Sequence, residues 1–454
     1  MIIQVYSDQD LSPRASEVIR SILDEKFPGR EIKFRQWLGN SNCRVLVFGR
    51  GPAVLPANVD LVYTYSVAQI MSKANAATVL AAGIQQFLQE PEKVPFVGPL
   101  WTAGTEHIQR LLDPTKPTAI DIETSGNLGK THIPEEVEIL TVAFYQEGNA
   151  PIVLVGSSGN KTLAEHQIKS LKDILPKFEK AIYHNGKFDT RVLNRVLGVK
   201  LCVWFDTMLA HHVLNIAAGD HKLKTLARRY LGAPEWEADL SKYTKGGGHY
   251  ELIPTDLLVQ YNGWDVYWTY KLWQFLSPQI ESDVSNQTAF EFEMQAAAFL
   301  LDVEAYGIPF DNEYAAEYAE ELEILRDSNK NQMRYILGNV DYNPNSPVQV
   351  KNAFHELGME ISGTDAKKVL IPYREENQLT QLQNSFMDLH LKFKELDKRR
   401  GTYAVGWANA SRKGRVHPTF LVHGTSTGRL SSTSPNAQNV PRDKTVRKIV
   451  RTHG

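Results

Sequence analysis

Along most of the chain, short apolar runs alternate with stretches in which apolar residues recur every three or four positions. Between about residues 101 and 276 the two patterns follow one another repeatedly. This alternation predicts an α/β unit, a mixed sheet flanked by helices. The expected strands are 117–124, 138–146, 150–155 and 180–185, and the clearest helices are 206–215 and 255–273.

The N-terminal part predicts a small α/β domain of its own. Two apolar runs typical of buried strands and two helical spacings are found here, the strands at 1–6 and 43–49 and the helices at 12–27 and 66–89. The proline-rich segment 90–100 then indicates a linker. No phosphate-binding glycine motif is present, so the pattern indicates no role for this domain.

From about residue 286 the pattern becomes helical and charged. Long helices are expected at 291–307, 312–337 and 384–411, and 414–432 returns to strand and loop. The linker and the change of pattern together predict three domains, at residues 1–95, 96–285 and 286–454.

Bulk composition excludes some classes of protein. A net charge of −2 argues against a protein that coats nucleic acid by charge alone, although it leaves room for a local basic groove. Cys43 and Cys202 fall in separate regions and indicate no disulfide framework or zinc site. No apolar run is long enough to span a membrane, and the first residues do not resemble a signal peptide. A cytoplasmic protein without a membrane partner is expected.

Acidic residues stand at suggestive places in the predicted elements of the second domain. Asp121 and Glu123 are two apart on a strand, so their carboxylates point to the same face. Asp189 lies in the first turns of a helix that follows a strand, and Tyr261 and Asp265 share one face of a later helix. Each has an ordinary structural explanation alone, such as an acid that complements a helix dipole.

Taken together, the four carboxylates predict a metal site. Two divalent cations roughly 3.5–4 Å apart are held in this way by two-metal phosphodiesterases. Hard carboxylate oxygens favour Mg²⁺ or Mn²⁺. The phenol of Tyr261, one helical turn before Asp265, is placed to orient an attacking water.

Other polar residues of this domain are interpreted as structural. Asp206 stands between a strand and a helix and is expected to be a helix N-cap, and Thr255 is expected to cap the helix that follows Pro254. His184, His211 and His212 lack metal-ligand spacing and are expected to be helix or turn residues.

The acidic motifs "DIE", "NGKFD" and "YNGWD" resemble those of the DEDDy 3′–5′ exonucleases. This resemblance implies an RNase H-like exonuclease fold. It also implies that Asp121, Glu123, Asp189 and Asp265 are the metal ligands and that Tyr261 takes part in catalysis.

The closing part of the chain resembles family A (Pol I-like) DNA polymerases, most specifically in "TGRLSSTSPNAQNVP" at 427–441. The resemblance implies a mainly helical thumb with the start of the palm. It also implies contacts to primer–template DNA by four side chains, Arg429, Asn436, Gln438 and Asn439. An arginine and short amides are suited to minor-groove acceptors. The alternative is that these residues only build turns.

A basic run, Lys398, Arg399 and Arg400, falls on the expected thumb helix. It is expected to grip the phosphate backbone of a duplex, although a solvated helix face would have the same composition.

In family A polymerases the metal-binding aspartates of the palm and the fingers helix would follow beyond residue 454. The expectation is therefore the exonuclease part of a split polymerase, of the kind found in some phages, in the bacterial host cytoplasm, or else a truncated product. It would act on single-stranded 3′ ends and primer–template, and a C-terminal partner chain would supply palm and fingers. The surface around 420–454 would then be apolar. The alternatives are a free-standing exonuclease with a thumb clamp and a non-catalytic DNA-binding scaffold.

Overall fold

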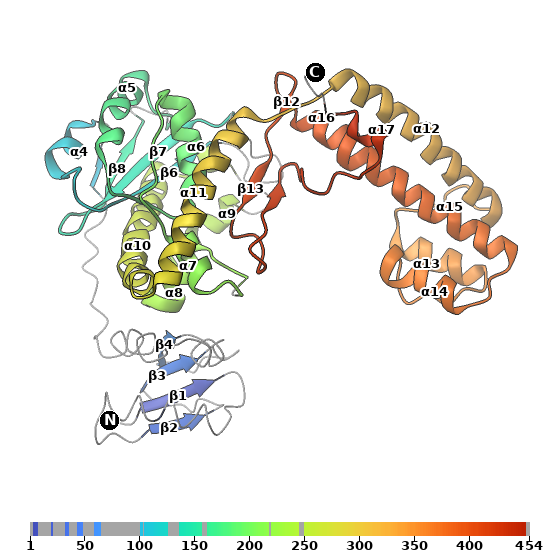
Figure 1. Cartoon of the computed structure of the whole chain (residues 1–454), viewed down its shortest axis with the longest axis horizontal. Helices are drawn as coiled ribbons and strands as arrows, with labels where there is room; N and C mark the ends of the chain where they lie inside the picture. Colours follow the sequence, from blue (N-terminus) through green and yellow to red (C-terminus); the bar gives the residue numbers. More distant parts are fainter. Residues whose placement is uncertain are drawn as a thin grey trace. The chain divides into compact units, whose positions relative to one another are not determined.

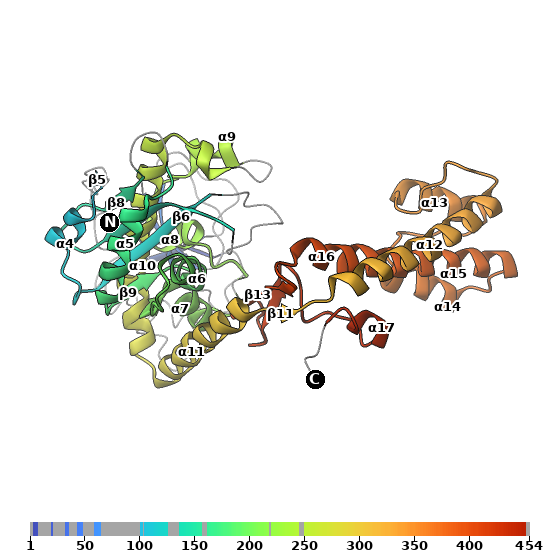
Figure 2. The same ribbon diagram turned by 90° about the horizontal axis from the view of Figure 1, so that it is seen from above.

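In the computed structural model, the described residues are 100–450, except 103, 126–135, 157–160, 218 and 245–248, together with Arg20 and four strands nearer the N-terminus. The chain divides into two compact units. The first is Met1–Leu301 with Val422–Leu430, and the second is Asp302–Leu421 with Ser431–Gly454. Figures 1 and 2 show their elements in two views.

The N-terminal strands form a parallel sheet in the order β2-β1-β3-β4. Their bounds are Ile3–Ser7 (β1), Ile32–Arg35 (β2), Cys43–Phe48 (β3) and Val59–Thr64 (β4). The predicted strands at 1–6 and 43–49 are confirmed. The predicted helices at 12–27 and 66–89 lie outside the described residues, apart from Arg20.

A six-stranded sheet in the order β10-β9-β6-β7-β8-β5 forms the centre of the first unit. Its strands are Leu100–Thr102 (β5), Thr118–Thr124 (β6), Ile139–Tyr145 (β7), Ile152–Val155 (β8), Ala181–Tyr183 (β9) and Phe205–Asp206 (β10). β7 runs antiparallel to β6 and β8, whereas the other pairs are parallel. The predicted mixed sheet is therefore confirmed. β7 is buried along its whole length because helices cover both faces of the sheet.

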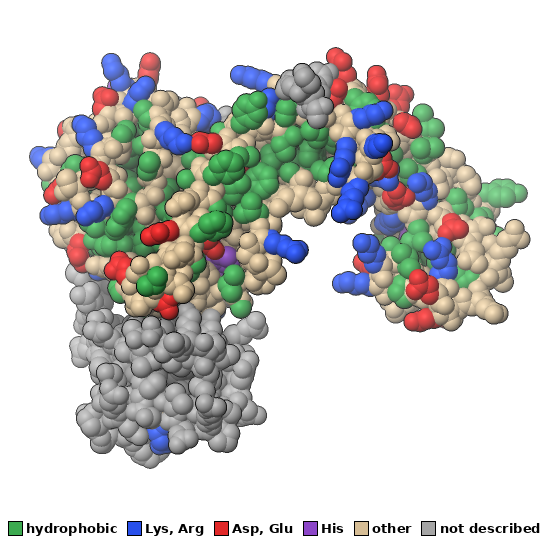
Figure 3. Space-filling view, viewed as in Figure 1, with side chains coloured by type: hydrophobic (Ala, Val, Ile, Leu, Met, Phe, Trp, Pro, Cys, Tyr) green, Lys and Arg blue, Asp and Glu red, His purple; other side chains and the backbone are tan. Residues whose placement is uncertain are grey.

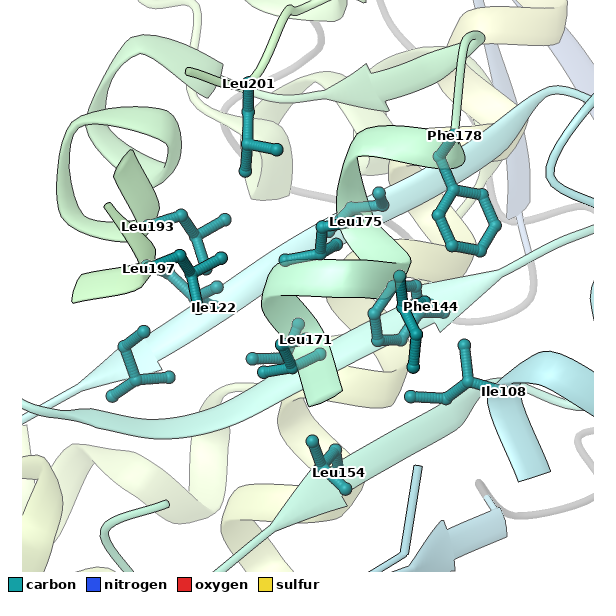
Figure 4. Close-up of a cluster of buried hydrophobic side chains, with 14 of the residues drawn as sticks. Ile108, Ile122, Phe144, Leu154, Leu171, Leu175, Phe178, Leu193, Leu197 and Leu201 are labelled. Carbon is teal, nitrogen blue, oxygen red and sulfur yellow. The ribbon is translucent and has the colours of Figure 1, made fainter. Parts of the chain in front are cut away.

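One face of this sheet carries the main hydrophobic core. The helices on it are α4 (Glu106–Leu111), α5 (Glu165–Ile174) and α6 (Gly186–Leu197). Figure 4 shows Leu171 of α5 and Leu193 of α6 above Ile122, Phe144 and Leu154 of the strands. Because Ile122 faces this core, its neighbours along β6 point to the opposite face.

The opposite face is covered by α10 (Thr255–Glu281), which contacts β6 and β7. Two more helices, α7 (Thr207–Leu214) and α8 (Leu223–Leu231), pack against α10. The described part of this unit also contains short helical turns, at Leu175–Lys177 (η1), Ala238–Leu240 (η2), Ser241–Thr244 (α9) and Tyr250–Leu252 (η3). The side chains of β6 that face away from the core therefore point toward α10.

The second unit is mainly helical, as predicted. α11 (Val284–Tyr306) runs into it from the first unit. It contains α12 (Asn312–Leu337), α13 (Pro347–Glu356), η4 (Ala366–Leu370), α14 (Ile371–Glu376), α15 (Gln381–Lys398), η5 (Arg399–Val405), α16 (Gly406–Ala410) and α17 (Lys444–Arg447). The helix expected at 384–411 is thus α15 continued through η5 into α16. The short strands pair β11 (Ile308–Pro309) with β12 (Arg415–Val416), and β13 (Thr419–Leu421) with β14 (Ser431–Thr433).

Two expectations are wrong. The N-cap of α10 is Pro254 rather than Thr255, and no side chain caps this helix; the Pro254 carbonyl accepts the first intrahelical bond from Leu258 N. The surface of residues 420–450 exposes no large hydrophobic side chain. Val446 and Ile449 are instead buried in the core of the second unit.

Large hydrophobic side chains are exposed elsewhere, for example at Phe292 and Phe299 on α11, a helix along which Figure 3 shows hydrophobic side chains. None of the described helices combines the length and the hydrophobicity that crossing a bilayer requires.

Candidate active site

Asp121 and Glu123 lie on β6, on the side that faces α10. The Asn262 side chain of α10 donates from Nδ2 to Asp121 Oδ2 at 2.6 Å. Its Oδ1 accepts from Thr141 Oγ1 of β7 at 2.8 Å, and Asn262 is completely buried. Because Thr141 fixes the orientation of the amide, Asn262 presents its donor to Asp121 and holds that carboxylate in place.

Asp265, also on α10, has both carboxylate oxygens occupied. Trp236 Nε1 donates to Oδ1 at 2.6 Å, and Lys224 Nζ donates to Oδ2 at 2.8 Å. The same ammonium lies 2.7 Å from the hydroxyl of Tyr261, one helical turn before Asp265. The Tyr–Asp pair recognised in the sequence therefore meets a lysine of α8 that no motif indicated.

Oxygen atoms of Asp121, Glu123 and Asp265 all lie within 4.8 Å of one another. Asp189 is not part of that group. It is buried in the first turn of α6, and its Oδ1 accepts from Ile122 N of β6 at 3.2 Å. The structure thus brings three of the four expected ligands together. The fourth, Asp189, is hydrogen-bonded to β6, the strand that carries Asp121 and Glu123.

Burial and mutual repulsion raise the pKa values of Asp121, Glu123 and Asp189. The pKa of Asp121 is raised well above its usual value by loss of hydration and then by the charges of Asp189 and Asp265. Burial likewise raises the pKa of Glu123 well above its usual value and that of Asp189 to about 8. Such a cluster of carboxylates needs a compensating cation, and hard oxygen donors fit divalent ions such as Mg²⁺ or Mn²⁺.

Tyr261 keeps its phenolic proton. Burial, followed by the charge of Asp265, raises the pKa of its hydroxyl well above 10. The Lys224 ammonium donates to the phenolic oxygen. The hydroxyl of Tyr261 also shares a side-chain hydrogen bond with that of Tyr250.

Asp206 is a helix N-cap, as predicted. Its Oδ1 accepts from Met208 N of α7 at 2.8 Å. The carboxylate also accepts from Asn185 N at 3.1 Å and Gly186 N at 2.8 Å, at the start of α6. Asp206 therefore joins the beginnings of two helices.

The histidines named from the sequence hold structural contacts. His211 Nδ1 lies 2.7 Å from His221 Nδ1, and its Nε2 lies 2.9 Å from the hydroxyl of Tyr230. His212 Nδ1 lies 2.8 Å from Glu293 Oε1 on α11. His184, after β9, contacts the hydroxyl of Thr207 at 2.8 Å.

The four side chains expected to contact primer–template fall in different settings. Arg429 is exposed on the loop Val422–Leu430 of the first unit, whereas the other three belong to the second unit. Asn436 Oδ1 accepts from the backbone N–H of both Gln438 and Asn439 at 3.1 Å. Asn436 thus builds the local turn, and the Gln438 and Asn439 side chains are exposed on it.

The basic run divides in the same way. Arg399 pairs with Glu395 at 2.6 Å and with Asp443 at 2.9 Å, and Arg400 pairs with Glu323 at 3.1 Å. Lys398 is exposed and makes no ion pair within the described part of the chain. Two of the three charges are therefore already matched by carboxylates.

Sequence reasoning missed three residues of the acidic centre. Asn262 directly follows Tyr261 in the "YNGWD" motif, and this adjacency is the one signal that pointed to it. Lys224 and Trp236 lie in stretches without a motif. Their contact with Asp265 arises only when α8 and the segment after it pack against α10.

The chain matches two family models. Residues 103–281 match a model described as 3′-5′ exonuclease, and residues 312–453 match DNA polymerase family A.

DNA polymerases are among its relatives. DNA polymerase I of Chloroflexus aurantiacus is 30% identical over 280 residues, which are 59% of this chain and 29% of that protein. DNA polymerase I of Treponema pallidum is 27% identical over 276 residues, 60% of this chain and 27% of that protein. The DNA polymerase of Escherichia phage T5 is 28% identical over 301 residues, 59% of this chain and 35% of that protein. The chain thus spans about a third or less of these relatives.

The POL domain of Pol1 from M. smegmatis, solved in complex with DNA primer-template and dNTP, shares the fold. The TM-score is 0.57 at 21% identity, over 78% of this chain and 57% of that one. Residues 103–281 thus match a 3′–5′ exonuclease domain, and residues 312–453 match the family A DNA polymerases.

Proposed function

We propose that this chain is a metal-dependent 3′–5′ exonuclease that removes nucleotides from DNA 3′ ends and so proofreads newly made DNA. The observation that carries the proposal is the convergence of Asp121, Glu123 and Asp265, whose oxygens lie within 4.8 Å of one another. The match of residues 103–281 to a 3′-5′ exonuclease model supports it.

Asp121, Glu123, Asp189 and Asp265 would hold two divalent cations. When bound, these ions supply a hydroxide at neutral pH and stabilise the leaving 3′ oxygen. Asn262 holds the Asp121 carboxylate in position, and Ile122 N does the same for Asp189. These contacts orient the ligands before substrate arrives.

Tyr261 acts on the water rather than on the metal. Its hydroxyl stays protonated, accepts from Lys224 and shares a hydrogen bond with Tyr250, and its O–H would turn from Tyr250 to the attacking water. The phenol therefore orients the nucleophile, and the reaction needs no histidine base.

Duplex contacts belong to the exposed basic and amide side chains. Arg429, Gln438, Asn439 and Lys398 are exposed and would contact sugar and phosphate oxygens of primer–template DNA. Asn436, Arg399 and Arg400, also expected to touch DNA, would act chiefly by shaping the surface of the second unit through their protein contacts.

The test is digestion of a 5′-labelled single strand and primer–template with Mg²⁺. We expect shortening by the wild-type chain and none by Asp121→Ala/Glu123→Ala, with unchanged thermal unfolding in EDTA. Shortening by the double variant would overturn the site assignment. If the wild-type chain binds DNA without shortening it, the result would favour the alternative function of a non-catalytic DNA-binding scaffold.

The requirement for a partner chain carrying palm and fingers stays a prediction. Adding dNTPs tests it with the same substrate. Extension by the chain alone would contradict it, and extension only after a palm-and-fingers polypeptide is added would support it.

A further inference from the structure

Lys224 of α8 places a positive charge inside the carboxylate cluster. Its Nζ lies 2.8 Å from Asp265 Oδ2 and 2.7 Å from the Tyr261 hydroxyl. The Lys224 side chain is 24% exposed and that of Asp265 is 6% exposed. The ammonium therefore occupies one of the oxygens through which Asp265 would bind a metal ion.

Aromatic rings fix the position of this ammonium. Nζ lies 4.5 Å from the centre of the Tyr261 ring and 5.7 Å from that of Trp236. Trp236 also donates from Nε1 to the other oxygen of Asp265 at 2.6 Å. Two acceptors and two aromatic rings hold Lys224, unlike a solvated surface lysine.

The charge of Lys224 also acts on Asp121 and Glu123. It lowers the pKa values of Asp121 and Glu123, whereas burial and the neighbouring carboxylates raise them. A divalent cation bound to the same carboxylates would neutralise their negative charge in place of Lys224. Since an ammonium and a dication on one carboxylate repel each other strongly at low effective dielectric, the two compete for Asp265.

We propose that Lys224 is a positioning residue that serves as the internal counter-ion of this site. Its ammonium holds Asp265 and Tyr261 in place without metal, and an incoming divalent cation displaces it from Asp265 Oδ2. The inference rests on the proposed function, because it takes Asp265 to be a metal ligand. It adds a residue that sets how tightly the site binds metal.

The test is calorimetric titration of the full chain with Mn²⁺ at pH 8, without DNA. Lys224→Met is expected to bind Mn²⁺ about tenfold more tightly than wild type, because a like charge is removed. Trp236→Phe is the matched control, since it removes the other hydrogen bond to Asp265 without changing charge, and no tightening is expected. Lys224→Arg restores the charge and is expected to return the affinity to within about twofold of wild type.

Lys224→Gln repeats the test with a side chain that still donates a hydrogen bond, in case Lys224→Met does not fold. Equal or weaker Mn²⁺ binding by Lys224→Met and Lys224→Gln would overturn the inference. The proposed function would still stand if the wild-type chain digests DNA. A wild-type chain that neither binds Mn²⁺ nor shortens DNA would overturn both.

Discussion

The acidic centre of the first unit and the segment 427–441 place polar side chains in opposite ways. The carboxylates of the centre come from β6, α6 and α10, and they meet only in the folded chain. The polar side chains of 427–441 are neighbours in the sequence, and Arg429, Gln438 and Asn439 face solvent.

The difference follows from hydration. A buried charge without a partner is strongly unfavourable, so the protein itself must supply donors. Asn262, Trp236 and Lys224 are such donors, aimed at Asp121 or Asp265. An exposed arginine or amide is satisfied by water and exchanges that water for a ligand. Substitutions in the centre are therefore expected to act through geometry and charge, and those in the segment through ligand contact.

The largest effect is expected from Asp265→Asn. The substitution keeps the shape of the side chain but removes a charge that a metal ion requires. A loss of about 10³-fold in kcat on a labelled single strand is expected, equivalent to several kcal/mol of lost transition-state stabilisation. Activity within tenfold of wild type would contradict the role of Asp265 as a ligand.

A smaller loss is expected from Asn262→Ala, which leaves the proposed metal ligands in place. Residues that orient ligands typically contribute about 10–100-fold to metal affinity or activity. Mn²⁺ titration and single-strand digestion measure both. Thr141→Val breaks only the outer hydrogen bond, to Asn262 Oδ1, and is expected to have a smaller effect in the same direction. An Asn262→Ala variant with wild-type affinity and rate would show that Asp121 needs no support.

Within the segment 427–441, Arg429→Ala is expected to change DNA binding, whereas Asn436→Ala is expected to change the stability of the fold. Arg429→Ala is expected to weaken primer–template binding and to reduce the slope of log affinity against log salt by about 1, without changing thermal stability. Asn436→Ala removes the acceptor of two backbone N–H groups and is expected to lower stability by about 1 kcal/mol. Equal effects of the two variants on stability would remove the distinction.

The smallest effect is expected at the loop that carries Arg429, which His212 of α7 contacts within the first unit. Its Nε2 lies 3.3 Å from the carbonyl oxygen of Thr425. Burial lowers the pKa of His212, but the hydrogen bond and charge of Glu293 together with this carbonyl raise it above 6.5 overall. A raised folded-state pKa stabilises the protein below pH 6.5, and this contribution is lost as the pH rises through the folded value.

Glu293→Gln is therefore expected to destabilise the protein more at pH 5.5 than at pH 8.5 in urea unfolding. Glu291→Gln, at an exposed position on the same helix, is the control and is expected to show no such difference. An equal destabilisation at both pH values would mean that His212 is neutral throughout.

The sequence by itself determined the architecture and the candidate ligands. Apolar periodicity located β6, β7 and α12, because it reflects which side of each element faces a core. The motifs around Asp121, Asp189 and Asp265 indicated a shared site. Each motif could be recognised because its strand or helix spacing involves only residues that are close together in the sequence.

Only the tertiary structure decided which partners these groups have. Lys224 and Trp236 reach Asp265, and Asp443 reaches Arg399, through contacts between distant stretches that no local pattern encodes. The expected apolar surface at 420–454 was wrong over residues 420–450 for the same reason, since Val446 and Ile449 found a core within the second unit. Residue type and spacing predict what a side chain needs, whereas packing between elements decides which group supplies it.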